Sequence, residues 1–109
     1  MEARATFSDV ITVIKDRLAH GAPSGSYVAQ LAAQGEDAIL QKIGEECTEV
    51  LLAAKNGERA ASIHEVADLQ FHLLVWMTWR GIALEDIEAE LGRRFGRSGL
   101  DTPAGSQPK

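Results

Sequence analysis

The sequence predicts an all-α fold, and three observations support this prediction. Apolar residues recur every three or four positions through most of the 109-residue chain. Glycines stand just after several of these runs, where they commonly end helices. No stretch alternates apolar and polar residues as a half-buried strand does. With 45% apolar residues and no repeat or linker, the chain is expected to form one bundle of about five helices.

Three helices are expected in the first half of the chain. The first stops at Gly21, and turn-forming residues follow it. Ser26 is then placed to cap a short helix over residues 27–34. A long helix should span about Glu36–Asn56, with Gly57 as its terminator.

Two further helices are expected in the second half. Ser62 should open a helix that continues to Arg80, after a five-residue connection. The last helix should run over about residues 84–95, and its apolar residues should form a buried face: Leu84, Ile87, Leu91 and Phe95. Residues 96–109 are rich in Gly, Ser and Pro and are expected to be a flexible tail, which leaves residues 1–95 as a single helical domain.

Composition excludes several classes of function. A net charge of −5 argues against a surface that binds nucleic acid. The single cysteine, Cys47, allows no internal disulfide and no thiolate cluster for zinc, and its spacing predicts that it faces the core. The longest apolar stretch, near residues 73–77, is too short to span a bilayer, and the first residues lack an apolar signal core. We therefore expect a soluble, cytoplasmic protein.

Two pairs of carboxylates lie on the two longest predicted helices. Glu46 and Glu49 are three residues apart on one helix, and Glu65 and Asp68 on the next, so each pair shares a helix face. Antiparallel helices packed about 8–10 Å apart could direct the two pairs at each other. Like charges 4 Å apart repel by about 4 kcal/mol at an effective dielectric constant of 20. Oxygen ligands of this kind favour a hard cation, Mg²⁺ or Mn²⁺, which could also hold an anionic substrate.

Structural roles compete with this interpretation for some of the polar residues. Ser62 and Glu65 have the spacing of a capping box, in which Glu65 would only satisfy the backbone. Glu45 points further out and could simply be solvated. A lone His72 on an apolar helix is more typical of a satisfied core or interface histidine than of a ligand. The stretch FHLLVWMTW around it is apolar on every side, which predicts burial either in the domain or against a partner chain.

These residues carry a family resemblance. Glu45-Glu46-x-x-Glu49, then fifteen residues, then Glu65-x-x-Asp68 resembles the EExxE…ExxD signature of the all-α nucleoside-triphosphate pyrophosphohydrolases, the MazG-like superfamily. The text SYVAQLAAQ, KIGEE, ADLQFH and RSG is most similar to the phosphoribosyl-ATP pyrophosphohydrolase branch, over roughly residues 7–100. Residues 100–109 lack the basic continuation that is usual in that branch.

The resemblance implies Mg²⁺-dependent hydrolysis of phosphoribosyl-ATP to phosphoribosyl-AMP and pyrophosphate, the second step of histidine biosynthesis, by a homodimer or larger assembly. It implies a set of metal ligands: Glu46, Glu49, Glu65 and Asp68. It makes Glu45, with Glu46 and Glu49, a catalytic candidate that could orient the attacking water. The implied substrate-binding residues are Lys42, Lys55, Ser26 and Tyr27.

Two other functions stay open on the sequence. A housekeeping enzyme that hydrolyses ordinary nucleoside triphosphates would share the same acidic residues. A non-catalytic helical dimerisation module would use these carboxylates only as caps and surface charge. Stabilisation by a divalent cation would distinguish an enzyme with a metal site from a dimerisation module without one, because a ligand of the folded state raises the melting temperature.

Overall fold

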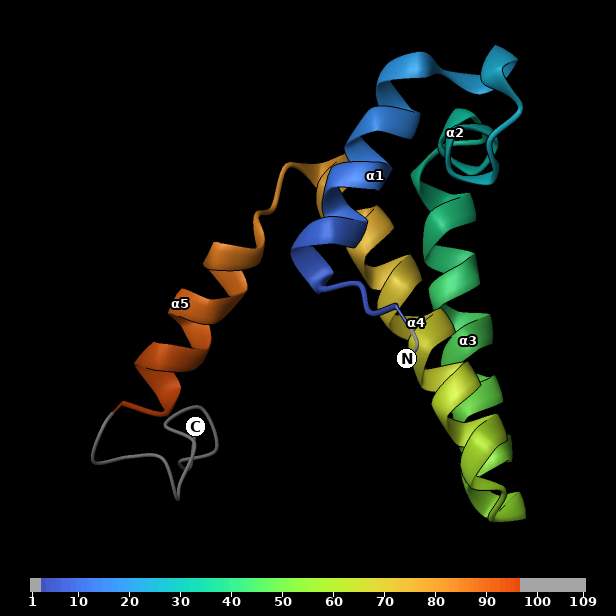
Figure 1. Ribbon diagram of the computed structural model, residues 1–109, viewed down its shortest axis with the longest axis vertical. Helices are drawn as coiled ribbons and strands as arrows, with labels where there is room; N and C mark the ends of the chain where they lie inside the picture. Colours follow the sequence, from blue (N-terminus) through green and yellow to red (C-terminus); the bar gives the residue numbers. More distant parts are fainter. Residues whose placement is uncertain (1–2, 97–109) are drawn as a thin grey trace.

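The computed structural model describes residues 3–96, and within them every regular element is helical (Figure 1). The elements are α1 (Phe7–His20), the short 3₁₀ helix η1 (Ala22–Ser24), α2 (Tyr27–Ala33), α3 (Glu36–Asn56), α4 (Arg59–Arg80) and α5 (Leu84–Arg94). The predicted all-α class with five α-helices is confirmed. The predicted flexible tail lies outside the described residues, except for Gly96.

The long helices α3 and α4 form an antiparallel hairpin, against which α1 and α2 pack. Figure 1 shows α1 against the second half of α4 and α2 beside the start of α3. The core lies where these four helices meet, and its buried side chains come from all of them: Ile14, Val28, Leu31, Ile39, Leu74, Val75 and Met77. The other end of the hairpin, toward the α3–α4 turn, extends beyond this core (Figure 1).

Local sequence signals explain most helix ends. The Ser26 hydroxyl accepts a hydrogen bond from the Ala29 amide and caps α2, as predicted. The bounds of α3 agree with the prediction, and Gly57 ends the helix with a φ of 74°, a left-handed conformation that favours glycine. Gly81 ends α4 in the same way, with a φ of 77°.

The predicted start of α4 at Ser62 is wrong. The helix begins at Arg59, and the Ser62 amide donates to the Glu58 carbonyl at 2.9 Å inside its first turn. Because Gly57 reverses the chain within two residues, the helix can start earlier than the serine suggested. Ser62 is therefore no cap, and the capping-box role that competed for Glu65 is removed.

Two predictions of burial are also wrong. Cys47 is exposed, because a helix turns about 100° per residue and this carries Cys47 away from the side on which Glu46 is buried. The apolar residues of α5 are not buried: Leu91 keeps 47% of its surface and Ile87 keeps 41%. The cause is visible in Figure 1, where α5 runs away from the hairpin and the core. Among the described residues, no helix is long and apolar enough to cross a membrane.

A polar cluster joins the start of α3 to the end of α4. The Glu36 carboxylate accepts hydrogen bonds from the Trp76 indole N–H at 2.9 Å and from the Arg80 guanidinium at 2.7 Å. Arg80 also lies over the Trp76 ring, 5.8 Å from its centroid. The hydrogen bond from Arg80, and then that from Trp76, hold the pKa of Glu36 below its ordinary value of 4.5.

This lowered pKa predicts how the cluster responds to acid. A carboxyl group with a lower pKa in the folded state stabilises the fold above its unfolded pKa and loses this effect as the pH falls through the folded value. Glu36→Gln should therefore lower the melting temperature at neutral pH, and the difference from wild type should vanish as the pH drops well below 4.5. Melting curves across this range are the measurement. Asp37→Asn, in the same first turn but exposed, is the control. A difference that persists unchanged at low pH would contradict the prediction.

Candidate active site

The predicted acidic residues lie on both helices of the hairpin. Glu46 lies on the inner side of α3 and is buried, with 8% of its surface exposed, as its position in the apolar stripe predicted. Glu65 and Asp68 are half-buried on α4. Glu45 and Glu49 are exposed on α3. The site thus combines one buried carboxylate with four that solvent can reach.

Lys42 neutralises part of the acidic charge on α3. Its ammonium group lies 3.4 Å from a Glu45 carboxylate oxygen and 3.5 Å from one of Glu46. Burial alone would lower the pKa of Lys42, but its contacts with Glu45, Tyr27 and Glu46 raise it above the ordinary value. Hydrogen bonds from Gln41 and then Lys42 lower the pKa of Glu45. A charged lysine therefore lies between the carboxylates, where a phosphate group could replace them as its partner.

On α4 the structure assembles one compact group of metal-ligating side chains. Ligand atoms of His64, Glu65 and Asp68 all lie within 4.8 Å of one another. The His64 Nε2 is 3.5 Å from an Asp68 carboxylate oxygen. Two of the four predicted metal ligands, Glu46 and Glu49, are not part of this group. The four predicted ligands therefore do not form a single cluster. The donor set, mostly carboxylate oxygen with one imidazole, fits a divalent cation.

Sequence reasoning missed His64. The signal was present, because His64 stands four residues before Asp68, and side chains at this spacing meet on a helix. The segment HEVAD departs from the zinc-protease pattern HExxH, because Asp68 occupies the place of the second histidine.

Tyr27 and His72 connect α2 to the hairpin. The Tyr27 hydroxyl lies 2.8 Å from the His72 Nε2, and the rings meet edge to face at 5.8 Å. His72 is buried, with 4% exposed, and its Nδ1 lies 2.9 Å from the Asp68 carbonyl oxygen. His72 is thus the satisfied core histidine that the sequence favoured. Burial is the main cause that raises the pKa of Tyr27; the Lys42 charge lowers it, and the Glu46 and Asp68 charges raise it.

Of the predicted substrate-binding residues, Lys55 lies far from this cluster and Ser26 has a structural role. Lys55 is exposed in the last turn of α3, thirteen residues and so about 20 Å along the helix from Lys42. Within one chain the two lysines therefore cannot hold the same phosphate. Ser26 caps α2, and it also borders an open cavity of about 370 Å³.

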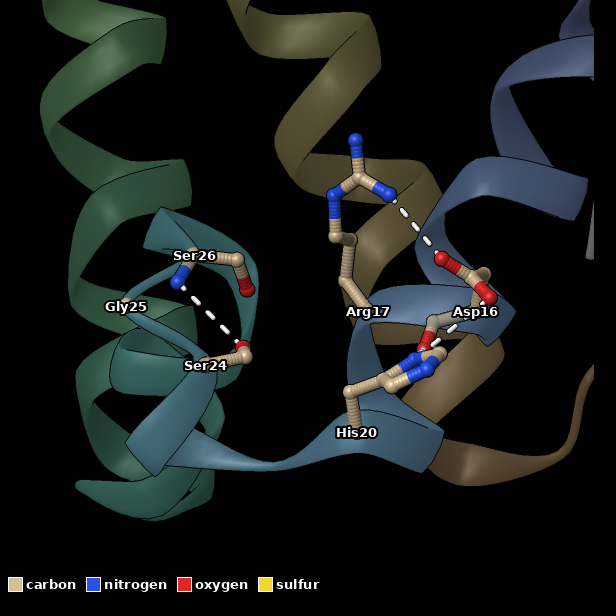
Figure 2. Close-up of a pocket in the computed structure, with 6 residues that line it drawn as sticks. All are labelled: Asp16, Arg17, His20, Ser24, Gly25 and Ser26. Atoms are coloured by element: carbon tan, nitrogen blue, oxygen red, sulfur yellow. Dashed lines mark hydrogen bonds and ion pairs between the residues drawn. The ribbon is translucent and has the colours of Figure 1, made fainter.

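Figure 2 shows that cavity at the end of α1. It lies between the Ser24–Ser26 segment and a cluster formed by Asp16, Arg17 and His20. Arg17 and His20 both pair with the Asp16 carboxylate, at 2.9 and 3.4 Å. The charges of this cavity are therefore largely balanced by one another, unlike those on the hairpin.

An all-helical fold built on a hairpin with carboxylates on both helices agrees with the resemblance to the all-α nucleoside-triphosphate pyrophosphohydrolases. Comparison with known proteins narrows this class. The sequence profile of the phosphoribosyl-ATP pyrophosphohydrolase family matches residues 7–95. The chain belongs to this family.

Proteins that align with most of this chain have names that agree with this assignment. A protein of Pelotomaculum thermopropionicum named phosphoribosyl-ATP pyrophosphatase is 57% identical over 79% of this chain and 87% of its own. Proteins of the same name from Chromobacterium violaceum and Geobacter metallireducens are 47% and 50% identical. Both alignments cover 92% of this chain, with 95% and 90% of the relatives' own lengths.

Proposed function

We propose that this chain hydrolyses phosphoribosyl-ATP to phosphoribosyl-AMP and pyrophosphate, as a step of histidine biosynthesis. The observation that carries the proposal is the cluster of carboxylates and Lys42 on the α3–α4 hairpin, in a chain that belongs to this family. A biosynthetic role of this kind agrees with action in the cytoplasm on a small nucleotide.

We infer that the site holds a divalent cation, with Mg²⁺ as the first candidate and Mn²⁺ as the second. Glu65 and Asp68 would hold it from α4, with Glu46 and Glu49 from α3. When bound, the cation supplies positive charge that offsets the negative charge of the pyrophosphate leaving group. The cluster on α4 supports this inference, because the carboxylates of Glu65 and Asp68 are close enough to repel one another without such a charge.

The protein's own residues would then perform the rest of the reaction. Water attacks a phosphorus atom of the α–β anhydride, a new phosphorus–oxygen bond forms, and the bridging bond breaks to release pyrophosphate. Glu45 is exposed and is the candidate that accepts the proton of this water. Lys42 would exchange its carboxylate partners for a phosphate of the substrate and hold it in place.

Pyrophosphate release tests the proposal directly. With Mg²⁺ present, phosphoribosyl-ATP should be hydrolysed much faster than any of the four ordinary nucleoside triphosphates, and EDTA should abolish the release. The cation should also raise the melting temperature, since saturation at a hundred times its dissociation constant stabilises a fold by about 2.7 kcal/mol. Equal rates with ordinary triphosphates would assign the protein to housekeeping hydrolysis instead. No release and no stabilisation would make the carboxylates structural.

We also infer that two copies of the chain associate through the distal half of the hairpin. Large apolar side chains are exposed there on both helices: Leu51, Leu52, Ile63 and Val66, with 66%, 55%, 56% and 41% of their surfaces free. A hollow beside α4 is lined by Phe7, Ile63 and Val66, with Ala67, Ser62 and Gln70. Apolar surface of this extent is typical of an interface.

A further inference from the structure

The helix α5 carries an apolar stripe that its own chain leaves largely uncovered. Leu84, Ile87 and Leu91 recur at the spacing that places side chains on one face of a helix. Ile87 and Leu91 keep 41% and 47% of their surfaces exposed. Figure 1 shows the reason, because α5 runs away from the hairpin and makes no long contact with the other helices that the structure describes.

Hydrogen bonds on both sides of the connection from α4 fix the direction of α5. Gly81 ends α4 in the left-handed conformation, and the Ile82 amide donates to the Met77 carbonyl at 2.8 Å. The Ile82 side chain packs against the core. The Ala83 amide then donates to the Asp86 carboxylate at 2.8 Å, where α5 starts. Because each residue of this short connection is held, α5 cannot easily fold back onto its own core.

The hollow beside α4 matches this stripe in spacing. Three of the residues that line it are separated by three and then four positions: Ile63, Val66 and Gln70. The residues of the α5 stripe have the same two intervals, so each set covers about 10 Å of helix. The hollow has a volume of about 470 Å³, and the small residues Ser62 and Ala67 in its lining leave room for large side chains of another helix.

The size of the exposed hairpin surface also indicates that a second element takes part in the association. The distal half of the hairpin and the hollow together offer eight residues: Phe7, Leu51, Leu52, Ser62, Ile63, Val66, Ala67 and Gln70. A stable interface uses roughly 20–30 residues of each partner, so this surface alone is too small. The eleven residues of α5 bring it close to that size. Because every copy carries one α5 and one hollow, reciprocal contacts close with two copies.

We propose that two copies of the chain exchange α5, so that the apolar stripe of each α5 packs into the hollow beside α4 of the other copy. The inference rests on the association of two copies proposed above, and it assigns α5 as the second component of that interface. The exchange covers the apolar side chains that a single chain leaves exposed on both elements.

Two variants remove one side of this contact each. Ile87→Lys places a charge in the stripe, and Val66→Glu places a charge of opposite sign in the hollow. Each should raise the dissociation constant of the dimer by at least about a hundredfold, because the introduced charge is buried without a partner. Ala89→Lys adds the same charge as Ile87→Lys on the opposite face of α5 and should leave the dimer intact.

A mixture of the two defective chains tests the exchange itself. In a mixed dimer the intact α5 of the Val66→Glu chain can enter the intact hollow of the Ile87→Lys chain. The second contact brings the two introduced charges of opposite sign together. Equal amounts of both chains should therefore dimerise at least about tenfold more tightly than either variant alone, as measured by analytical ultracentrifugation. Circular dichroism should show that all variants keep their helices.

Each result decides a different statement. If Ile87→Lys stays as dimeric as Ala89→Lys, α5 lies outside the interface, and the exchange is overturned while association through the hairpin stands. If the mixture dimerises no more tightly than the single variants, α5 and the hollow do not meet. If the wild-type chain is monomeric at every concentration, the proposed association fails, and the exchange fails with it.

Discussion

Glu46→Gln is expected to lower kcat for pyrophosphate release by at least about a hundredfold. Loss of a group that only supports a metal ligand commonly costs 10–100-fold, and Glu46 is proposed as a ligand itself. The substitution keeps the size of the side chain and removes its charge. Because Glu46 is buried, with its contact to Lys42 at 3.5 Å, no neighbouring carboxylate can easily take its place.

The measurement is steady-state pyrophosphate release over a range of Mg²⁺ concentrations, alongside a melting curve without metal. The fold should survive, since glutamine matches the size of the side chain and Lys42 keeps its contact with Glu45. Glu88→Gln, an exposed carboxylate on α5 away from the hairpin, is the control and should keep wild-type activity. Full activity of Glu46→Gln, together with lost stability, would show that Glu46 serves the fold and not the reaction.

Ile63→Lys is expected to convert the proposed dimer into monomers. In a symmetric dimer one substitution places two ammonium groups in the interface, and each must lose water without gaining a partner. Like charges brought together in this way cost several kcal/mol, so the dissociation constant should rise by at least about a hundredfold. Ile63 is suited to the test, because 56% of its surface is exposed and it lines the apolar hollow beside α4.

Sedimentation or light scattering across a range of protein concentrations gives the mass directly. Val13→Lys, on α1 and outside that hollow, is the matched control, since Val13 is 48% exposed. It should leave the dimer intact, and circular dichroism should show that both variants keep their helices. A wild-type chain that stays monomeric at all concentrations would refute the proposed association, and equal dissociation by Val13→Lys would move the interface elsewhere.

Local signals in the sequence were sufficient for much of the fold. Glycine after an apolar run gave the ends of α3 and α4, because the left-handed turn at Gly57 and Gly81 is a local preference. The cap of α2 by Ser26 was also predictable, because it depends on a hydrogen bond within the first turn. The start of α4 was misplaced because no capping residue marks it: Glu58 precedes the helix without a side-chain cap. There, the tight turn after α3 decided the boundary.

Periodicity alone could not determine which faces are buried. Glu46 was correctly placed on the inner side of α3, where the contact with α4 is continuous. Ile87 and Leu91 fit an equally good apolar stripe, but their helix makes no long contact with the other helices that the structure describes. The link from Tyr27 to His72 joins residues 45 positions apart, and no local pattern reports such a contact.

The departure of α5 from the core gives the molecule two levels of local stability. The helix has eleven residues, and isolated helices shorter than about 12–15 residues are marginal in water. Its support is mainly internal: Asp86 accepts from the Ala83 amide at 2.8 Å, and Arg93 and Arg94 hold the pKa of Glu90 down to about 2. In a single chain, α5 can therefore unwind and reform while the α3–α4 hairpin stays folded, so opening of this helix need not disturb the carboxylates of the site.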